Sequence, residues 1–284
     1  MMEEKAFAKV NLTLEILSKR ADGFHEIQSV LQTIDIYDSL FLEPAPDLVL
    51  EEGVPGLPPE DNLVMRAARL LQKETGTEKG ARLRLRKRIP VAAGLGGGSS
   101  DAAATLRGLN RLWGLGLDTP RLEGMAAQLG SDVPFFIRGG TALVQGRGEV
   151  LTQLPDVQET WFVLACLPIQ LPNKTAELYK LMVPRLFTRG EHTRMLVFEV
   201  NAGNPVRSLY FNNAFEGVAF VAFTGLREFY HELEATGADR IRLSGSGPTL
   251  FSMVEDEVQG RELLLRCDRR GLPAYLVKTV AKPL

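Results

Sequence analysis

The run Gly94-Leu-Gly-Gly-Gly-Ser-Ser100 constrains the fold of this chain more than any other segment. It follows a basic, strand-like stretch that leads into Pro90, and a helix-like stretch from Ala102 to Trp113 comes after it. Three consecutive glycines let backbone N–H groups approach an anion without interference from Cβ atoms. The start of the following helix adds unpaired N–H groups and the positive end of its dipole. The segment therefore predicts a phosphate-binding loop that joins a strand to a helix.

The spacing of this loop differs from that of the common nucleotide-binding motifs. A Walker loop would end in Gly-Lys-Ser/Thr, and no such tripeptide follows here. A Rossmann fingerprint would need a glycine in place of Ser99 and an earlier start in the chain. The protein-kinase motifs His-Arg-Asp and Asp-Phe-Gly are absent. A flexible glycine turn with capping serines is the alternative, because a glycine-rich loop alone predicts function poorly.

Composition narrows the class of protein. A chain of 284 residues favours one large or two moderate domains, and 45% hydrophobic with 24% charged residues is typical of globular proteins. The formal net charge of −2 gives no overall reason to expect a nucleic-acid partner. The local basic run Arg82–Arg88 alternates with apolar residues, which favours a strand with one solvated charged face over an RNA-binding patch.

The sequence shows no clear signal for secretion, membrane insertion, disulfide bonds or zinc binding. The N-terminal residues lack the apolar core of a signal peptide, and no apolar run approaches the ~20 residues of a membrane helix. Cys166 and Cys267 are too few and too far apart for a disulfide framework or a zinc site, and both are expected to be buried thiols. We therefore expect a cytoplasmic protein without a membrane partner.

Strand-like and helix-like segments mix along the chain without strict alternation, which favours an α+β fold over a doubly wound sheet. The polar, glycine-rich stretch 146–156 suggests a boundary between domains at 1–152 and 153–284. The patterns predict strands at 5–17, 31–42, 82–88, 135–144, 161–167, 240–243, 249–254 and 274–279. They predict helices at 102–113, 175–181 and 257–270. Two further helices are predicted to begin after caps at 61–62 and 119–120, and one is predicted to run through Leu226 after a capping box at Asn213–Glu216.

Other possible functional residues are ambiguous when each is taken alone. Lys9 lies in an apolar strand-like segment, where a lysine often belongs to an edge strand or extends to solvent. Asp132 follows a helix and is more often a turn or capping residue than a catalytic one. The turn Ser244-Gly-Ser-Gly247 could be a plain hairpin, and His25 by itself means little.

As a set, these features resemble the GHMP kinases. Three blocks carry the resemblance in the family's order, and they span both halves of the chain: Ala8–Leu12 with Arg20–His25, Pro90–Ala103 with Gly130–Phe135, and Ser244–Gly247. The resemblance implies an N-terminal domain like domain 2 of ribosomal protein S5, a ferredoxin-like C-terminal domain and an active site in the cleft between them.

The resemblance also implies an activity. ATP, with Mg²⁺, would phosphorylate the 2-hydroxyl of a cytidine-diphosphate-linked methylerythritol in the non-mevalonate pathway to isoprenoid precursors. The alternatives are a kinase for another small alcohol, such as homoserine or mevalonate, and a non-catalytic nucleotide- or RNA-binding module, since S5-like folds also bind RNA. An RNA-binding surface would show steeply salt-dependent affinity. The kinase interpretation implies no nucleic-acid partner and a monomer or weak homodimer.

Matching the family's motifs residue by residue assigns the site. Asp132 would be the catalytic acid/base residue and Lys9 its partner. Asn11 and His25 would hydrogen-bond the substrate, Phe24 and Tyr179 would sandwich the cytosine, and Thr175 would also contact the substrate. Phe24 departs from the tyrosine more usual after Asp-Gly in this family, which removes a phenol hydrogen bond but keeps stacking. The residues implied for ATP are Pro90, Val91, Ala92, Ala93, Gly94, Leu95, Gly96, Gly97, Gly98, Ser99 and Ser100.

No protein ligand for a metal is assigned by the sequence, and Asp101, after the paired serines, is interpreted as a helix cap.

Overall fold

The computed structural model describes residues 1–54, 56–169 and 171–281, and the chain divides into two compact units. The first comprises Met1–Ala8, Ile36–Val91 and Gly96–Gly139, and the second comprises Lys9–Asp35, Ala92–Leu95 and Gly140–Leu284. Two long strands, β1 (Met2–Lys19) and β2 (His25–Ala45), contribute residues to both units. The α+β class predicted from the sequence is confirmed, whereas the boundary at 152/153 stays a prediction.

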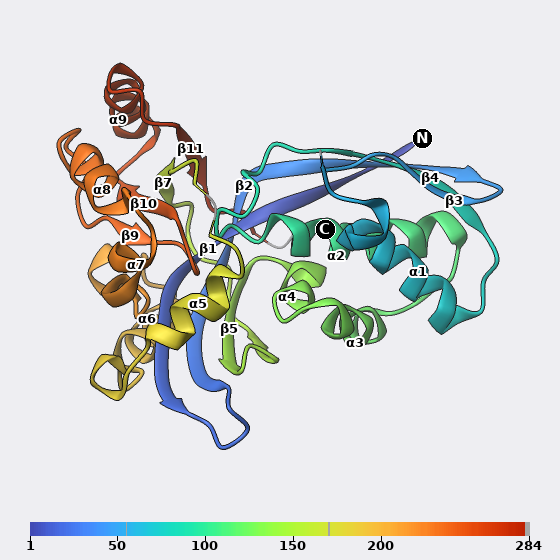
Figure 1. Ribbon diagram of the computed structural model, residues 1–284, viewed down its shortest axis with the longest axis horizontal. Coiled ribbons are helices and arrows are strands. Elements are labelled where there is room, and N and C mark those ends of the chain that lie inside the picture. The colour runs from blue at the N-terminus through green and yellow to red at the C-terminus, as the bar shows by residue number, and fades with distance from the viewer. Residues whose placement is uncertain (55, 170, 282–284) are drawn as a thin grey trace. The chain divides into compact units, whose positions relative to one another are not determined.

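The first unit is a sheet with helices on one side (Figure 1). Its strand order is β3-β4-β2-β1, in which β4 pairs parallel with β3 and antiparallel with β2. The helices that gather on one side are α1, α2, α3 and α4. Their bounds, with those of the two remaining strands, are β3 Leu48–Glu52, α1 Leu63–Thr75, β4 Gly80–Arg86, α2 Gly97–Trp113, α3 Thr119–Leu129 and α4 Val133–Arg138.

Local capping explains where two of these helices begin. The side chain of Asn62 accepts a hydrogen bond from the Val64 amide at 2.9 Å, which confirms the cap predicted for α1. The cap of α3 is Asp118, which accepts from the Arg121 amide at 3.0 Å, one residue earlier than predicted. Each cap satisfies an amide that the helix leaves unpaired, so both starts are encoded locally.

The basic strand β4 has the two faces that its alternation predicts. Leu83 and Leu85 are buried, whereas Arg82 and Arg86 are exposed. The Arg84 guanidinium lies 5.1 Å from the centre of the Phe41 ring, so an aromatic contact fixes part of the charged face. The prediction of a solvated charged face is confirmed.

Three local predictions are wrong. The helix predicted through Leu226 is two helices, α7 (Glu216–Ala222) and α8 (Leu226–Glu234), with Gly225 as the N-cap of the second. Residues 133–138 form helix α4 rather than the start of a strand, because Pro134 suits a first helical turn and Gly139, with φ of 65°, ends the helix. Asn213 and Glu216 do not form a capping box: Asn213 Oδ1 accepts from the Phe215 amide at 2.9 Å, two residues on, and Glu216 accepts from the Leu243 amide. A tertiary contact therefore takes the carboxylate that the pattern assigned to a local cap.

The second unit contains an antiparallel sheet of order β11-β7-β10-β9. In addition, β2 pairs antiparallel with β5, β5 pairs with β6, and β1 pairs parallel with β8. The strands are β5 Thr141–Gly146, β6 Val150–Gln153, β7 Trp161–Cys166, β8 Asn212–Asn213, β9 Arg242–Leu243, β10 Thr249–Val254 and β11 Ala274–Lys278. The helices are α5 Lys174–Leu181, α6 Glu191–Asn201, α7 Glu216–Ala222, α8 Leu226–Glu234 and α9 Glu257–Arg269.

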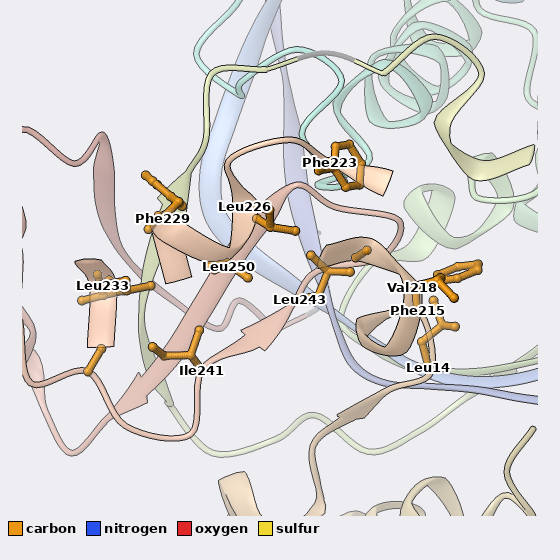
Figure 2. Packing of buried hydrophobic residues seen from close by; sticks show 14 of the residues in the cluster. Leu14, Phe215, Val218, Phe223, Leu226, Phe229, Leu233, Ile241, Leu243 and Leu250 are labelled. Carbon is orange, nitrogen blue, oxygen red and sulfur yellow. The ribbon is translucent and has the colours of Figure 1, made fainter. Parts of the chain in front are cut away.

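The hydrophobic core of this unit forms where α7 and α8 pack against the strands (Figure 2). Leu226 and Leu233 of α8 and Leu250 of β10 are almost completely buried. Burying a leucine side chain contributes about 1.5–3 kcal/mol relative to leaving it exposed. This packing supports the turn that joins β9 to β10.

The two cysteines are free and buried, as predicted. Burial raises the pKa of the Cys166 thiol to about 11, which disfavours the reactive thiolate. In the part of the chain that the structure describes, no helix has both the length and the apolar character needed to span a bilayer.

Candidate active site

The predicted phosphate loop joins β4 to α2 and has an unusual backbone. Gly94 and Gly96 have φ of 86° and 73°, and Ala92, which has a side chain, also has a positive φ of 57°. A non-glycine residue in this region is strained and persists only where its surroundings hold it. The loop conformation is therefore imposed by its contacts.

Hydrogen bonds to four successive backbone carbonyl groups hold the loop in this conformation. The carbonyl oxygens of residues 92–95 accept in turn from Lys174 Nζ at 2.6 Å, the Thr249 amide at 3.2 Å, Ser244 Oγ at 3.2 Å and the Lys9 amide at 3.0 Å. A trans peptide places its N–H opposite its carbonyl. Because these carbonyls face the protein, the amides of the next residues face the other way, as a phosphate site requires.

The turn between β9 and β10 approaches the loop closely. A Cβ atom on Gly94 would lie 2.3 Å from the Ser244 carbonyl oxygen and 3.0 Å from the Gly247 backbone nitrogen. Only glycine allows this approach at the observed φ. The Ser-Gly-Ser-Gly segment that could have been a plain hairpin therefore supports the phosphate loop.

The start of α2 has its own features suited to an anion. The helix is 17 residues long, its N-cap is Gly96, and no side chain caps its first turn among the described residues. The first amides of such a helix point at an anion, and its dipole favours negative charge. The loop residues therefore fit the phosphates of ATP. Ser100 is buried, whereas Gly97 and Ser99 are partly accessible.

Lys9 and Asn11 lie beside the tip of the loop. Lys9 is 3% exposed, and its ammonium donates to Asn11 Oδ1 at 2.5 Å. The Asn11 amide in turn donates to Ser29 Oγ at 2.7 Å. A Cβ atom on Gly245 would lie 3.0 Å from both Lys9 Nζ and the Gly94 carbonyl oxygen. The structure thus brings together the predicted Lys9, Asn11, the loop tip and the turn 244–247.

Asp132 lies in the first unit, at the N-cap position of α4. Its φ and ψ of −84° and −15° are helical, and its side chain makes no capping hydrogen bond to the described residues of the helix. The residue is half-buried, whereas its neighbour Val133 is completely buried. Asp132 is therefore a turn residue, as one of its two structural interpretations predicts, and the Val133 amide closes the turn by donating to the Gly130 carbonyl oxygen at 3.2 Å. The other interpretation, a side-chain helix cap, is wrong.

An aromatic cluster in the second unit contains His25 and Tyr179. Their rings stack, with centres 4.7 Å apart and planes at 14°, and Phe187 packs edge-on against His25 at 5.9 Å. Burial, followed by the Lys19 charge, lowers the pKa of His25, so its imidazole is neutral at neutral pH. Phe24 is 55% exposed, and the Arg147 guanidinium lies 4.7 Å from its ring centre. Tyr179 therefore stacks on His25, and it also packs edge-on against Phe215 with ring centres 4.9 Å apart.

Thr175 and Tyr179 share helix α5 with Lys174. The Thr175 hydroxyl donates to Ser246 Oγ at 3.0 Å, and Lys174 Nζ also donates to the Gly247 carbonyl oxygen. Sequence reasoning missed Lys174, whose only signal is its place directly before the predicted Thr175. A lysine at the start of a helix opposes the dipole, which indicates that another contact holds it there.

The prediction that Asp101 caps a helix is wrong. Gly96 is the N-cap of α2, whereas Asp101 is the helix's fifth residue and is 3% exposed. Its carboxylate pairs with Lys87 Nζ at 2.7 Å. Sequence reasoning placed Lys87 with the solvated basic run, but the residue follows the end of β4 and turns inward.

Comparison with known proteins identifies the class. The family model for the GHMP kinases N terminal domain matches residues 62–140, and the model for the GHMP kinases C terminal domain matches residues 200–272. The chain belongs to the GHMP kinase family, and it is an ATP-dependent small-molecule kinase.

Its relatives point to one member of that family. Proteins named 4-diphosphocytidyl-2-C-methyl-D-erythritol kinase are 41% identical to this chain in Dehalococcoides mccartyi, over 99% of both chains, and in Symbiobacterium thermophilum, over 98% of this chain and 100% of that protein. A crystal structure of 4-(cytidine 5'-diphospho)-2C-methyl-D-erythritol kinase matches with a TM-score of 0.84 at 33% identity, covering 98% of this chain and 99% of the other. Mevalonate kinase from L. major matches with a TM-score of 0.75 at 17% identity, covering 99% and 97%, which shows the shared fold.

Proposed function

We propose that this chain transfers the γ-phosphoryl group of ATP to the 2-hydroxyl of 4-diphosphocytidyl-2-C-methyl-D-erythritol, giving the 2-phosphate and ADP. This step belongs to the non-mevalonate pathway to isoprenoid precursors. The observation that carries the proposal is the phosphate loop, whose four carbonyls are turned toward the protein while the start of α2 is left without a side-chain cap. The relatives of that name, similar over nearly the whole chain, support the choice of substrate.

The loop residues Pro90–Ser100 would hold the phosphates of ATP through backbone amides. Bound Mg²⁺ would offset the charge of the β- and γ-phosphates. No group of three or more His, Cys, Asp or Glu side chains is placed to hold a metal among the described residues. The proposal therefore has the ion arrive with the nucleotide.

Asp132 would orient the acceptor hydroxyl and accept its proton as the new O–P bond forms. A carboxylate is too weak a base to remove that proton beforehand, because an alcohol is a far weaker acid than a carboxylic acid. In a loose phosphoryl-transfer transition state the proton leaves late, so a weak base suffices. Lys9, a buried cation beside the loop tip, would offset charge that develops on the transferring group. Positioning would supply more of the acceleration than basicity.

The aromatic cluster would bind the cytosine. Phe24 and Tyr179 would provide aromatic faces, and His25, held against Tyr179, would provide a neutral ring that can both donate and accept hydrogen bonds. Asn11 and Thr175 would contribute further polar contacts. A flat, neutral base suits this mixture of rings and hydrogen-bonding groups.

The test of the function is release of ADP from Mg·ATP in a coupled assay with three separate acceptors. We expect turnover with 4-diphosphocytidyl-2-C-methyl-D-erythritol and none with homoserine or mevalonate. Turnover with one of the other alcohols would keep the phosphate loop and overturn the proposed substrate. Absence of turnover with all three, from folded protein that binds ATP, would favour a binding module.

Replacing Tyr179 with alanine is expected to raise the KM for the cytidyl acceptor by about tenfold to a hundredfold, because base–aromatic stacking contributes about 1–3 kcal/mol. The KM for ATP should stay unchanged. Initial rates at varied concentrations of each substrate measure both constants. Tyr179→Phe should retain the wild-type KM, since it keeps the ring.

A matched control for this variant is Tyr230→Ala. Tyr230 lies in the same unit and packs edge-on against Phe220 with ring centres 5.6 Å apart, so it tests the loss of an aromatic contact alone. An unchanged acceptor KM in Tyr179→Ala, or an equal rise in Tyr230→Ala, would remove Tyr179 from the proposed base site.

A further inference from the structure

A buried ionic cluster in the first unit is not used by the proposed chemistry. Lys87 Nζ lies 2.5 Å from Asp38 Oδ2 and 2.7 Å from Asp101 Oδ2, and these side chains are 15%, 0% and 4% exposed. Taking charges out of water costs several kcal/mol per ion, so a buried cluster of this kind is weak evidence of a gain in stability. Its position in the fold points to another purpose.

The cluster joins the two ends of the phosphate loop. Asp38 Oδ1 accepts hydrogen bonds from the amides of Arg88 at 2.5 Å and Ile89 at 2.9 Å, the last two residues before the loop begins at Pro90. Asp101 lies in the second turn of α2, just after the loop ends. Lys87 therefore links the segment that leads into the loop with the helix that leaves it.

The ammonium of Lys87 also lies directly against the first residue of α2. A Cβ atom on Gly97 would be 3.2 Å from Lys87 Nζ and 3.1 Å from Ile89 Cγ2. The first amides of α2 are those that would meet the phosphates. A displacement of Lys87 would therefore change the position of the first α2 amides.

The charge state of Asp101 fits this position. Burial raises the pKa of Asp101 to about 7, with Lys87 lowering it and Asp38 raising it further. Asp101 Oδ1 is buried and has no hydrogen-bond partner among the described residues. The two carboxylates raise the pKa of Lys87 overall, although its burial acts in the opposite direction, so the ammonium stays charged. A neutral side chain at 101 would therefore keep the cluster's bond to Lys87 and remove its net negative charge.

We propose that Asp38, Lys87 and Asp101 are positioning residues for ATP, which fix the separation of the two ends of the phosphate loop and the direction of the first α2 amides. The inference rests on the family's use of ATP and not on the identity of the acceptor. It concerns residues that act through the loop rather than by contact with the acceptor.

The test compares Asp101→Ala with Asp101→Asn by calorimetric titration with a non-hydrolysable ATP analogue and Mg²⁺, without an acceptor. Asp101→Ala should weaken binding by about tenfold, because the Lys87 charge loses one of its two buried partners and the start of α2 is no longer tied to the entry of the loop. Asp101→Asn retains the shape and an acceptor for Lys87, and should bind as wild type does. In steady-state assays the KM for ATP should rise in Asp101→Ala while the KM for the acceptor stays unchanged.

Glu4→Gln is the matched control. Glu4 is a buried carboxylate of the same unit that pairs with Arg107 and Arg111, farther along α2. It should lower the free energy of unfolding without changing the affinity for the analogue. If Asp101→Ala does not fold, Lys87→Met combined with Asp101→Asn removes the link while leaving Asp38 with its two amide donors, and it should show the same loss.

Three results would overturn the proposal. They are wild-type affinity in Asp101→Ala or in the double variant, failure of asparagine to restore binding, and an equal loss of affinity in Glu4→Gln. The last would show that any buried ion pair of this unit has the same effect. Because the titration contains no acceptor, an error in the proposed substrate would not change its outcome.

Discussion

Replacing Asp132 with alanine is expected to lower kcat by about 10²–10⁴-fold, the usual contribution of a general base. The affinity for ATP should stay close to that of the wild type, because in the proposed site the loop amides and the start of α2 would bind the phosphates and the Asp132 side chain would not. The side chain of Asp132 makes no capping hydrogen bond to the described part of α4, so its replacement should leave the start of that helix intact. Steady-state rates and titration with a non-hydrolysable ATP analogue measure the two quantities.

Two further variants separate catalysis from structure. Asp132→Asn keeps the size of the side chain but cannot accept the proton, and its kcat should fall nearly as far. Asp118→Ala removes a true cap in the same unit, that of α3, and should cost about 1 kcal/mol of stability without changing kcat. Wild-type turnover in Asp132→Ala would exclude the residue as the base.

Features encoded within a few residues could be predicted from the sequence. The cap of α1 at Asn62 follows from a polar residue directly before an apolar helical pattern, and the structure confirms it. A tight loop after Pro90 follows from the same kind of local argument, although Gly97 and Gly98 lie inside α2 rather than before it. The role of this loop in binding phosphate stays a prediction. The α+β class likewise depends only on the order of local patterns.

Features that depend on distant partners could not be predicted. Lys87 reads as part of a solvated basic run, and only the fold shows Asp38 and Asp101 on either side of it. Glu216 satisfies the pattern of a capping box, but the amide of Leu243, 27 residues away in the sequence, donates to its carboxylate instead. In both cases a buried polar group needs a hydrogen-bond or ion-pair partner, and the sequence does not indicate which residue the fold places next to it.

The aromatic cluster shows the same limit within the candidate site. The motif that contains Phe24 and His25 predicts two adjacent rings, but not which of them packs on Tyr179. The structure stacks His25 there and places Phe24 under the Arg147 guanidinium. His25 is the first residue of β2 and Phe24 directly precedes it. Because successive side chains at a strand point in opposite directions, one of the two rings is held in the cluster and the other stays exposed.

Replacing Gly94 with alanine is expected to lower kcat/KM for ATP by at least about a hundredfold, because a displacement of about 1 Å at a reacting centre can cost that much. The added Cβ would lie 2.3 Å from the Ser244 carbonyl oxygen, which is backbone and cannot rotate away. Either the loop or the turn 244–247 must move. Titration with the ATP analogue and initial rates at varied ATP measure the loss.

Gly76→Ala provides the matched control for the backbone strain. Gly76 ends α1 with φ of 68°, and a Cβ there would meet nothing within 4 Å. An alanine at position 76 would have to adopt the left-handed conformation but would meet no close contact. It should lower the free energy of unfolding by about 1–2 kcal/mol and leave the affinity for ATP unchanged. If Gly94→Ala and Gly76→Ala have similar free energies of unfolding but only Gly94→Ala binds ATP more weakly, the loss of affinity comes from the close contact at Gly94.

The size of the effect at Gly94 follows from how the loop is held. The carbonyls of residues 92–95 are bonded to four different residues, on β1, β10, α5 and the turn 244–247. Moving one peptide away from the turn strains the bonds of its neighbours, so the amides proposed to bind the phosphates would move together. An unchanged affinity in Gly94→Ala would mean that these carbonyl contacts do not set the loop, and it would also remove the basis for assigning Lys174 and Ser244 to its support.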